Sequence, residues 1–255
     1  MATIIVLSIL TIFVYLTLFW IFALIQKRND IADVAWGMGF IVLTLVLFLQ
    51  SNSIGTKAIF LLCMVIIWGG RLAIHIALRH RGKPEDKRYQ TMRESWKYKR
   101  LQSYTHVFLT QGFFLLLVAT PIILFFLDSK SLLQWFNLIG LALWAFGFLF
   151  EAISDYQLTQ FIKNPLNKGK IMRYGLWRYT RHPNYFGEIT CWWGFYVFTL
   201  FTPFWYLGII GPITITLLIL GVSGIPMLEK HYEGNQEYDA YKKTTSAFFP
   251  LPPKL

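Results

Sequence analysis

The stretch GLWRYTRHPNYFGE, residues 175–188, carries side chains that suit the binding of an anion. A proline is favoured at the first position of a helix, because the amide hydrogen it lacks has no partner there. Pro183 therefore predicts a helix start, with His182 as its cap, and Arg178 and Arg181 lie just before it. Free amides at a helix N-terminus together with arginines form an anion site, and phosphate is the anion we expect.

Three further residues of this region are predicted to share one face of that helix. Asn184, Glu188 and Trp192 follow one another at intervals of four residues. Glu188 could accept hydrogen bonds from a ribose or an amide. The alternative is an arginine-rich turn that binds lipid head groups, which explains the arginines but not Asn184 and Glu188.

Other ionisable residues lie inside strongly apolar runs, where they are costly and are therefore functional candidates. Asp33 opens one run, and Arg71 and His75 lie four residues apart in another. Glu151 and Asp155 are also four residues apart. Arg71 could instead neutralise one of these acids in a structural pair. Because most of them lie near the cytosolic ends of predicted spans, we expect a polar cavity open to the cytosol.

The elements that carry these residues are predicted to be membrane helices. The chain has 255 residues, of which 55% are hydrophobic, and its apolar runs approach the 20 or so residues that cross a bilayer. We therefore expect an all-α polytopic integral membrane protein with one membrane-embedded domain over residues 1–255. The seven predicted spans are residues 3–25, 31–49, 56–78, 105–127, 132–161, 184–201 and 204–228. Gly221, Gly224 and Pro226 could break the last one.

The basic residues give the expected orientation. With seven spans, 21 of the 24 Lys and Arg fall on the side of the C-terminal tail. Since cytosolic loops carry the excess of Lys and Arg, the N-terminus is predicted outside and the C-terminus in the cytosol. Part of the net charge of +11 then sets the orientation, and part is expected to bind anionic lipids or a phosphorylated cofactor. We therefore expect membrane lipids, and no nucleic acid, as partners. The membrane is a bacterial inner membrane or the endoplasmic reticulum.

Several segments together resemble a known family. They are SDYQLTQFIKNP (154–165), the 175–188 motif and the tail SGIPMLEKHYEGNQEYDAYKKTTSAFFP (223–250). They look like the steroid 5-alpha-reductase family, and most closely its bacterial-type branch, which also carries DVAWGMGF and RHRGKPEDKRY. The resemblance covers nearly the whole chain. It implies a seven-helix membrane reductase in which NADPH enters from the cytosol and reduces the carbon–carbon double bond of an enone in a lipophilic substrate.

The resemblance also implies which residues bind the cofactor. Carried over by motif, these are Lys83, Asp155, Lys170, Tyr179, Arg181, His182, Asn184, Tyr185, Glu188, Trp192 and Tyr232. No metal is implied, and the two cysteines lie in apolar runs without metal-ligand spacing.

The catalytic pattern departs from the family. Steroid reductases polarise the substrate ketone with a glutamate in the second span and a tyrosine in the third. Here Asp33 is the nearest acid, and the tyrosine position falls near Trp68 or Gly69. The catalytic candidates are therefore Asp33, which would have to be protonated to donate, and Arg71 or His75. The substrate and the oligomeric state stay open.

Two other functions fit part of the sequence. Membrane methyltransferases of the isoprenylcysteine carboxyl methyltransferase type, which use S-adenosylmethionine, carry a similar RHPxYxG and an acid like Glu229. SDYQL, the DxxWG segment and the basic loop of residues 79–104 disfavour them. A lipid-binding or transport protein is the second alternative, but the chain shows no inverted repeat of the kind many transporters have.

Overall fold

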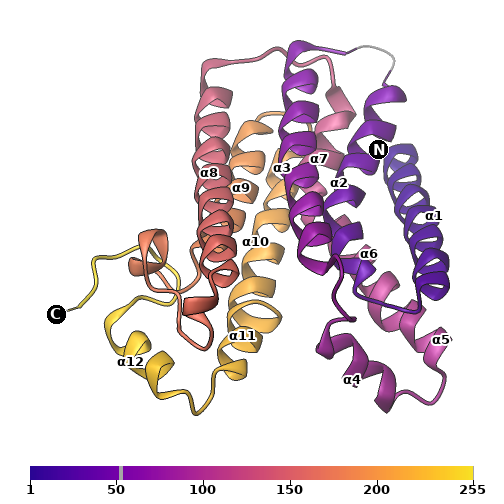
Figure 1. The fold of residues 1–255 in the computed structure, drawn as a ribbon. Coiled ribbons are helices and arrows are strands. Elements are labelled where there is room, and N and C mark those ends of the chain that lie inside the picture. Colours follow the sequence, from indigo (N-terminus) through magenta and orange to yellow (C-terminus); the bar gives the residue numbers. More distant parts are fainter. Residues whose placement is uncertain (52–53, 255) are drawn as a thin grey trace. The chain divides into compact units, whose positions relative to one another are not determined.

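The computed structural model describes residues 1–51 and 54–254, and the described chain is all-α apart from one isolated bridge (Figure 1). Its backbone divides into two compact units. The first comprises residues 1–134 and 199–211, and the second comprises residues 135–198 and the chain from 212 onward.

The first unit is built on three long helices, α1 (Ala2–Gln26), α2 (Ile31–Leu49) and α3 (Thr56–His80). In the chain order α1, α2, α3, each packs against the next (Figure 1). Many apolar side chains of α1 are nevertheless exposed, which is expected for a helix that faces lipid. These three helices confirm the first three predicted spans to within two residues at each end.

The fourth span of the first unit begins earlier than the sequence predicted. It runs over Lys99–Val118 as α5 (Lys99–Ser103), the π-helix η1 (Tyr104–Leu109) and α6 (Thr110–Val118). The separate helix α7 (Thr120–Phe125) follows, with Pro121 near its start. Proline cannot donate to a continuing helix, so it favours a new helix at this point. The remaining elements of the unit are α4 (Lys87–Ser95), η2 (Phe126–Asp128) and η5 (Trp205–Ile209).

The second unit is built on an antiparallel pair, α8 (Trp135–Lys163) and α9 (Pro183–Phe198). Glycines let the two backbones approach closely: a Cβ on Gly187 would lie 2.5 Å from the Glu151 nitrogen, and one on Gly147 would lie 2.6 Å from the Cys191 nitrogen. With 16 residues α9 is about 24 Å long, shorter than the ~30 Å hydrocarbon layer. It is therefore not among the long spans.

The last apolar segment, Trp205–His231, is broken where the sequence predicted. It contains α10 (Ile210–Leu217), the π-helix η6 (Leu218–Val222) and α11 (Ile225–His231), and the chain bends at Gly224. A Cβ on Gly224 would lie 2.5 Å from the Ile219 carbonyl oxygen, so the bend requires a glycine. The short helices η3 (Pro165–Asn167) and η4 (Gly175–Arg178) precede α9, and α12 (Gln236–Thr244) lies in the tail.

In the described residues, six helical segments are long and apolar enough to cross a membrane. The protein is therefore a polytopic integral membrane protein. The count of seven spans, the orientation, the particular membrane and the single domain stay predictions.

Candidate functional site

The 175–188 motif is attached to the end of α8. The Trp177 indole Nε1 donates to the Ser154 carbonyl at 3.1 Å, and the Leu176 amide donates to Gln157 Oε1 at 3.0 Å. Gly175 has a φ of +61°, and a Cβ there would lie 2.5 Å from the Gln157 amide group. The motif therefore begins as a turn that is held by two residues of the SDYQL segment.

Arg181 lies in a buried ion pair. Its Nε and Nη2 donate to Glu229 Oε1 on α11, at 3.0 and 2.7 Å. Its Nη1 donates to the carbonyl of Thr245 at 2.6 Å and to that of Lys242 at 3.3 Å. Only 9% of Arg181 is exposed. The arginine that the sequence assigned to a phosphate thus holds α11 and the tail against the motif.

His182 shares the same carboxylate. Its Nε2 lies 3.1 Å from Glu229 Oε1, while Nδ1 is buried without a hydrogen-bond partner in the part of the chain that the structure describes. Burial lowers the pKa of His182 and outweighs the opposing effect of Glu229. The neutral ring then donates from Nε2, which leaves Nδ1 as an acceptor.

The tail runs back across the motif. The Arg181 amide donates to the Ser246 carbonyl at 2.9 Å, and the Leu251 amide donates to the Tyr179 carbonyl at 3.0 Å. The Tyr241 hydroxyl donates to the Trp177 carbonyl. Residues 177–181 and the tail are therefore one folded substructure.

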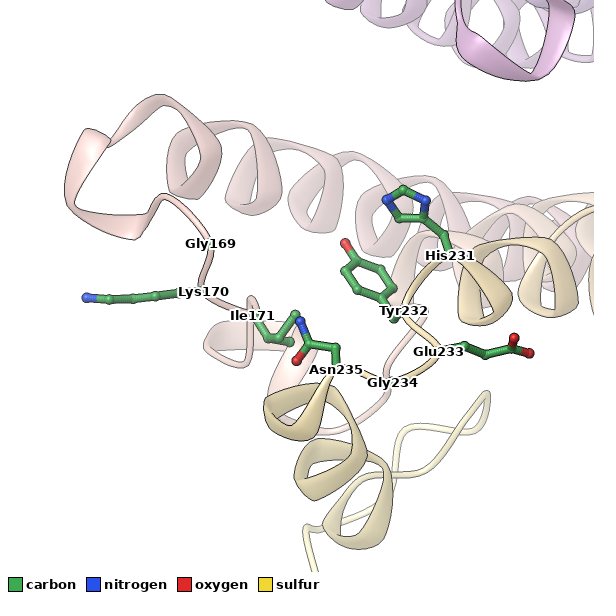
Figure 2. Close-up of a pocket in the computed structure, with 8 residues that line it drawn as sticks. All are labelled: Gly169, Lys170, Ile171, His231, Tyr232, Glu233, Gly234 and Asn235. Atoms are coloured by element: carbon green, nitrogen blue, oxygen red, sulfur yellow. The ribbon is translucent and has the colours of Figure 1, made fainter. Parts of the chain in front are cut away.

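An open pocket of about 600 Å³ lies beside this substructure (Figure 2). It is lined by Gly169, Lys170, Ile171, His231, Tyr232, Glu233, Gly234 and Asn235. The volume lies within the range of small-molecule sites. Two residues of the predicted cofactor set, Lys170 and Tyr232, thus line one pocket, although they are more than 60 residues apart in the sequence.

One wall of the pocket is aromatic. The Tyr232 ring stacks on Tyr238 with centroids 4.5 Å apart, and Tyr238 belongs to a buried cluster with Ile171 and Tyr241. Burial raises the pKa of the Tyr238 and Tyr241 hydroxyls, so both are neutral at physiological pH. In Figure 2 the side chains of Lys170 and Glu233 extend outward, away from Tyr232. The pocket therefore has a ring-binding wall and charged groups at its rim.

The other predicted cofactor residues of the second unit do not line this pocket. Asn184, Tyr185, Glu188 and Trp192 lie on α9, as the sequence predicted, and Asp155 is buried near the end of α8. The partly exposed Tyr179 belongs to the turn before α9.

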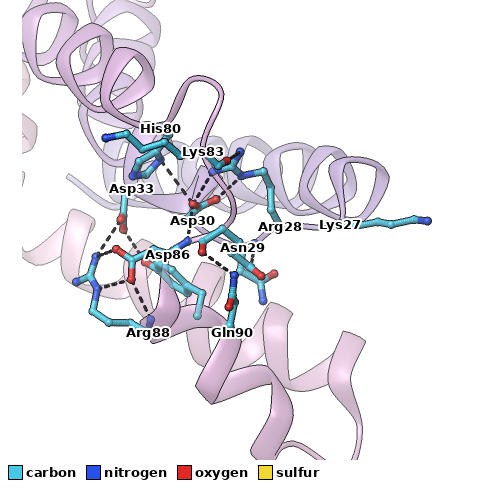
Figure 3. Close-up of polar contacts among 12 residues, drawn as sticks. Lys27, Arg28, Asn29, Asp30, Asp33, His80, Lys83, Asp86, Arg88 and Gln90 are labelled. Atoms are coloured by element: carbon cyan, nitrogen blue, oxygen red, sulfur yellow. Dashed lines mark hydrogen bonds and ion pairs between the residues drawn. The ribbon is translucent and has the colours of Figure 1, made fainter.

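In the first unit, Asp33 is part of a polar network near the start of α2 (Figure 3). The Tyr89 hydroxyl donates to Asp33 Oδ1 at 2.5 Å, and Arg88 Nη2 lies 3.4 Å from Oδ2. Arg71 and His75 lie on α3. Lys83 is exposed, and its carbonyl accepts from Arg28 Nη1 at 3.3 Å.

The rest of this network ties the loop after α3 to the turn before α2. Asp30 accepts from Arg28 at 2.6 Å and from the Asp86 amide at 3.0 Å. Burial opposes ionisation of Asp30, but these hydrogen bonds outweigh burial and lower its pKa. Glu85 accepts from the Asn29 amide at 2.6 Å. We predicted from the sequence that residues of this loop contact a ligand. In the structure its acids Glu85 and Asp86 make contacts within the protein instead.

Sequence reasoning missed Tyr89 and Glu229 as partners of the candidate residues. Tyr89 follows a run of charges, and its buried state was not visible in the pattern. Glu229 was noted only as a methyltransferase-like acid. The one signal in the sequence was the predicted break at Gly224. A break there lets α11, which carries Glu229, run in a direction different from that of the preceding helix.

Fold and site define an integral membrane protein with a polar substructure at the ends of its helices. A family profile described as "Protein of unknown function (DUF1295)" matches residues 19–245, so the chain belongs to this family. No curated protein and no solved structure matches the chain significantly.

Proposed function

We propose that the protein is a membrane-embedded reductase that uses NADPH to reduce the conjugated double bond of a lipophilic enone. The observation that carries the proposal is the single pocket that both Lys170 and Tyr232 line. The motif resemblance assigned both residues to cofactor binding, and their sequence separation gave no reason to expect a shared cavity.

The residues of the pocket fit a dinucleotide phosphate. Tyr232 offers a flat face for an aromatic ring, and Lys170 in the lining offers a cation for phosphate. The exposed Lys168 and Lys230 are close to the lining residues in the sequence and add to the positive charge of these segments. In Figure 2 the side chains of Lys170 and Glu233 extend in opposite directions, so the carboxylate that would repel phosphate lies apart from the lysine. S-adenosylmethionine carries no phosphate, so Lys170 at the rim favours NADPH.

NADPH, when bound, supplies the hydride. The chain must supply a hydrogen-bond donor for the charge that develops on the substrate carbonyl. Our candidates remain Asp33, Arg71 and His75. Tyr89 is a positioning residue for Asp33, because its single hydroxyl hydrogen is donated to Asp33 Oδ1 at 2.5 Å.

One observation favours the methyltransferase alternative. The Arg181–Glu229–His182 contacts use the two motif residues and the acid that the chain shares with such enzymes. These contacts are internal and bind the tail, so they fit either cofactor and do not replace the argument from Lys170.

The reaction class can be tested in the host membrane. Lipid extracts of a deletion strain and its parent are compared by mass spectrometry. The proposal predicts that the deletion strain accumulates a lipid two hydrogens lighter than a parental species, and that the wild-type gene reverses this. Accumulation of a species one methylene lighter would instead support methyl transfer.

A further inference from the structure

The cations of the turn before α2 and of the loop after α3 form two groups: some pair with carboxylates, and the others do not. Arg28 pairs with Asp30, and Arg93 Nη2 lies 2.5 Å from Glu85 Oε2. Arg88 lies within 3.4 Å of Asp33 and 3.1 Å of Asp86. These three arginines are therefore occupied by buried or half-buried acids and are not free for another partner.

The remaining cations of this region are exposed. Among the described residues, none of them has a carboxylate within ion-pair distance, and the exposed Glu94 is the only acid of residues 79–100 outside an ion pair. In Figure 3 the Lys27 side chain extends away from the paired groups. The exposed cations are Lys27, Arg79, Arg81, Lys83, Lys87, Lys97, Lys99 and Arg100.

Three of these cations alternate with exposed apolar side chains. The segment Trp96–Leu101 contains Lys97, Lys99 and Arg100, while 61% of Tyr98 and 60% of Leu101 are exposed. Lys97 Nζ lies 5.3 Å from the centroid of the Tyr98 ring. Lys99 is also the first residue of the candidate span Lys99–Val118. The segment therefore lies where a membrane helix begins.

We propose that Trp96–Leu101 is a binding surface for the head group and upper acyl chain of an anionic phospholipid. The cations attract a phosphodiester, and the exposed tyrosine and leucine enter the apolar layer beside them. A soluble phosphate would use the cations but would leave Tyr98 and Leu101 in water. The surface is separate from the cofactor pocket and does not depend on the proposed reaction.

The test uses the full-length protein in phosphatidylcholine bilayers that contain trace spin-labelled phosphatidylglycerol or spin-labelled phosphatidylcholine. Electron spin resonance gives the relative affinity of the two probes for the protein surface. We expect wild-type protein to favour phosphatidylglycerol about threefold at low ionic strength, and this preference to fall towards one in about 0.5 M salt.

The variant Lys97→Gln/Lys99→Gln/Arg100→Gln should lose at least half of the preference. The control Lys242→Gln/Lys243→Gln/Lys254→Gln removes three cations from the tail and should retain it. The proposal is overturned if wild-type protein shows no preference, if the control loses as much as the variant, or if pyrophosphate at constant ionic strength displaces the lipid. If the triple variant does not fold, the single variants Lys97→Gln and Lys99→Gln replace it, and each should lower the preference while the control does not.

Discussion

Glu229 Oε1 lies 2.7 Å from Arg181 Nη2, which joins two residues that are 48 positions apart. The same oxygen contacts His182 Nε2. One carboxylate thus connects α11 to both residues that open the RHPNYFG motif, and the carbonyls of the tail complete the hydrogen bonds of Arg181.

Replacing Glu229 with alanine should destabilise the second unit. Arg181, of which only 9% is exposed, would lose its counter-ion, and an unpaired buried charge is costly. Because Glu229 is partly solvated, we expect a loss of about 2 kcal/mol, and about half as much for Glu229→Gln. Thermal unfolding of the detergent-purified protein and protease sensitivity of the tail measure the effect. Glu233→Ala, at an exposed position, should leave both unchanged; equal effects of Glu229→Ala and Glu233→Ala would contradict the role of the ion pair.

The buried His182 should make stability depend on pH between about 5 and 7. Its folded-state pKa lies below that of the unfolded chain, so the unfolded state binds more protons in this range. Stability is therefore full above the unfolded pKa of about 6.5 and falls as the pH is lowered. The melting temperature of His182→Gln should decline less than that of wild type between pH 7.5 and 5.5. The exposed His231→Gln is the control, and a parallel decline in all three proteins would refute the assignment.

Gly187 should be required for the α8–α9 pair. A valine there would collide with the Glu151 backbone nitrogen, since even a Cβ would lie 2.5 Å from it. We expect Gly187→Val to abolish the monodisperse peak in size-exclusion chromatography. Gly70→Val is the matched control, because a Cβ at Gly70 would have no atom of the described chain within 4 Å apart from its neighbours and the nearby backbone of its own helix. A normal profile for Gly187→Val would show that the two helices can separate without loss of the fold.

The sequence predicted the long helices well because hydropathy reports a local property, the transfer of each segment into lipid. It also predicted Pro183 as a helix start and the bend near Gly224. It could not predict that Arg181 would pair with Glu229, or that Arg93 would pair with Glu85. These are tertiary pairings, and an arginine next to a helix start has the same sequence pattern whether it binds a ligand or a carboxylate. A span was predicted over residues 184–201, and a helix does lie there, but its 16 residues are too few to cross the hydrocarbon layer in a straight helix.

Tyr89 and Asp33 should be energetically coupled. Tyr89→Phe removes the donor of the 2.5 Å hydrogen bond, and Asp33→Asn weakens its acceptor. Each change should cost about 1–2 kcal/mol, and the double variant should cost clearly less than the sum, because all three variants lose or weaken the same hydrogen bond. Unfolding measurements on the four proteins give the coupling. Strict additivity would show that the contact contributes nothing.

The central claim is that the pocket containing Lys170 and Tyr232 binds NADPH. The most direct measurement is the thermal stability of the purified protein in titrations with NADPH, NADH and S-adenosylmethionine, since a ligand that binds only the folded state raises its apparent stability. We predict that NADPH raises the melting temperature most and that Lys170→Ala reduces this shift, whereas Lys254→Ala, an exposed tail control, does not. Stabilisation by S-adenosylmethionine without any response to NADPH would contradict the claim.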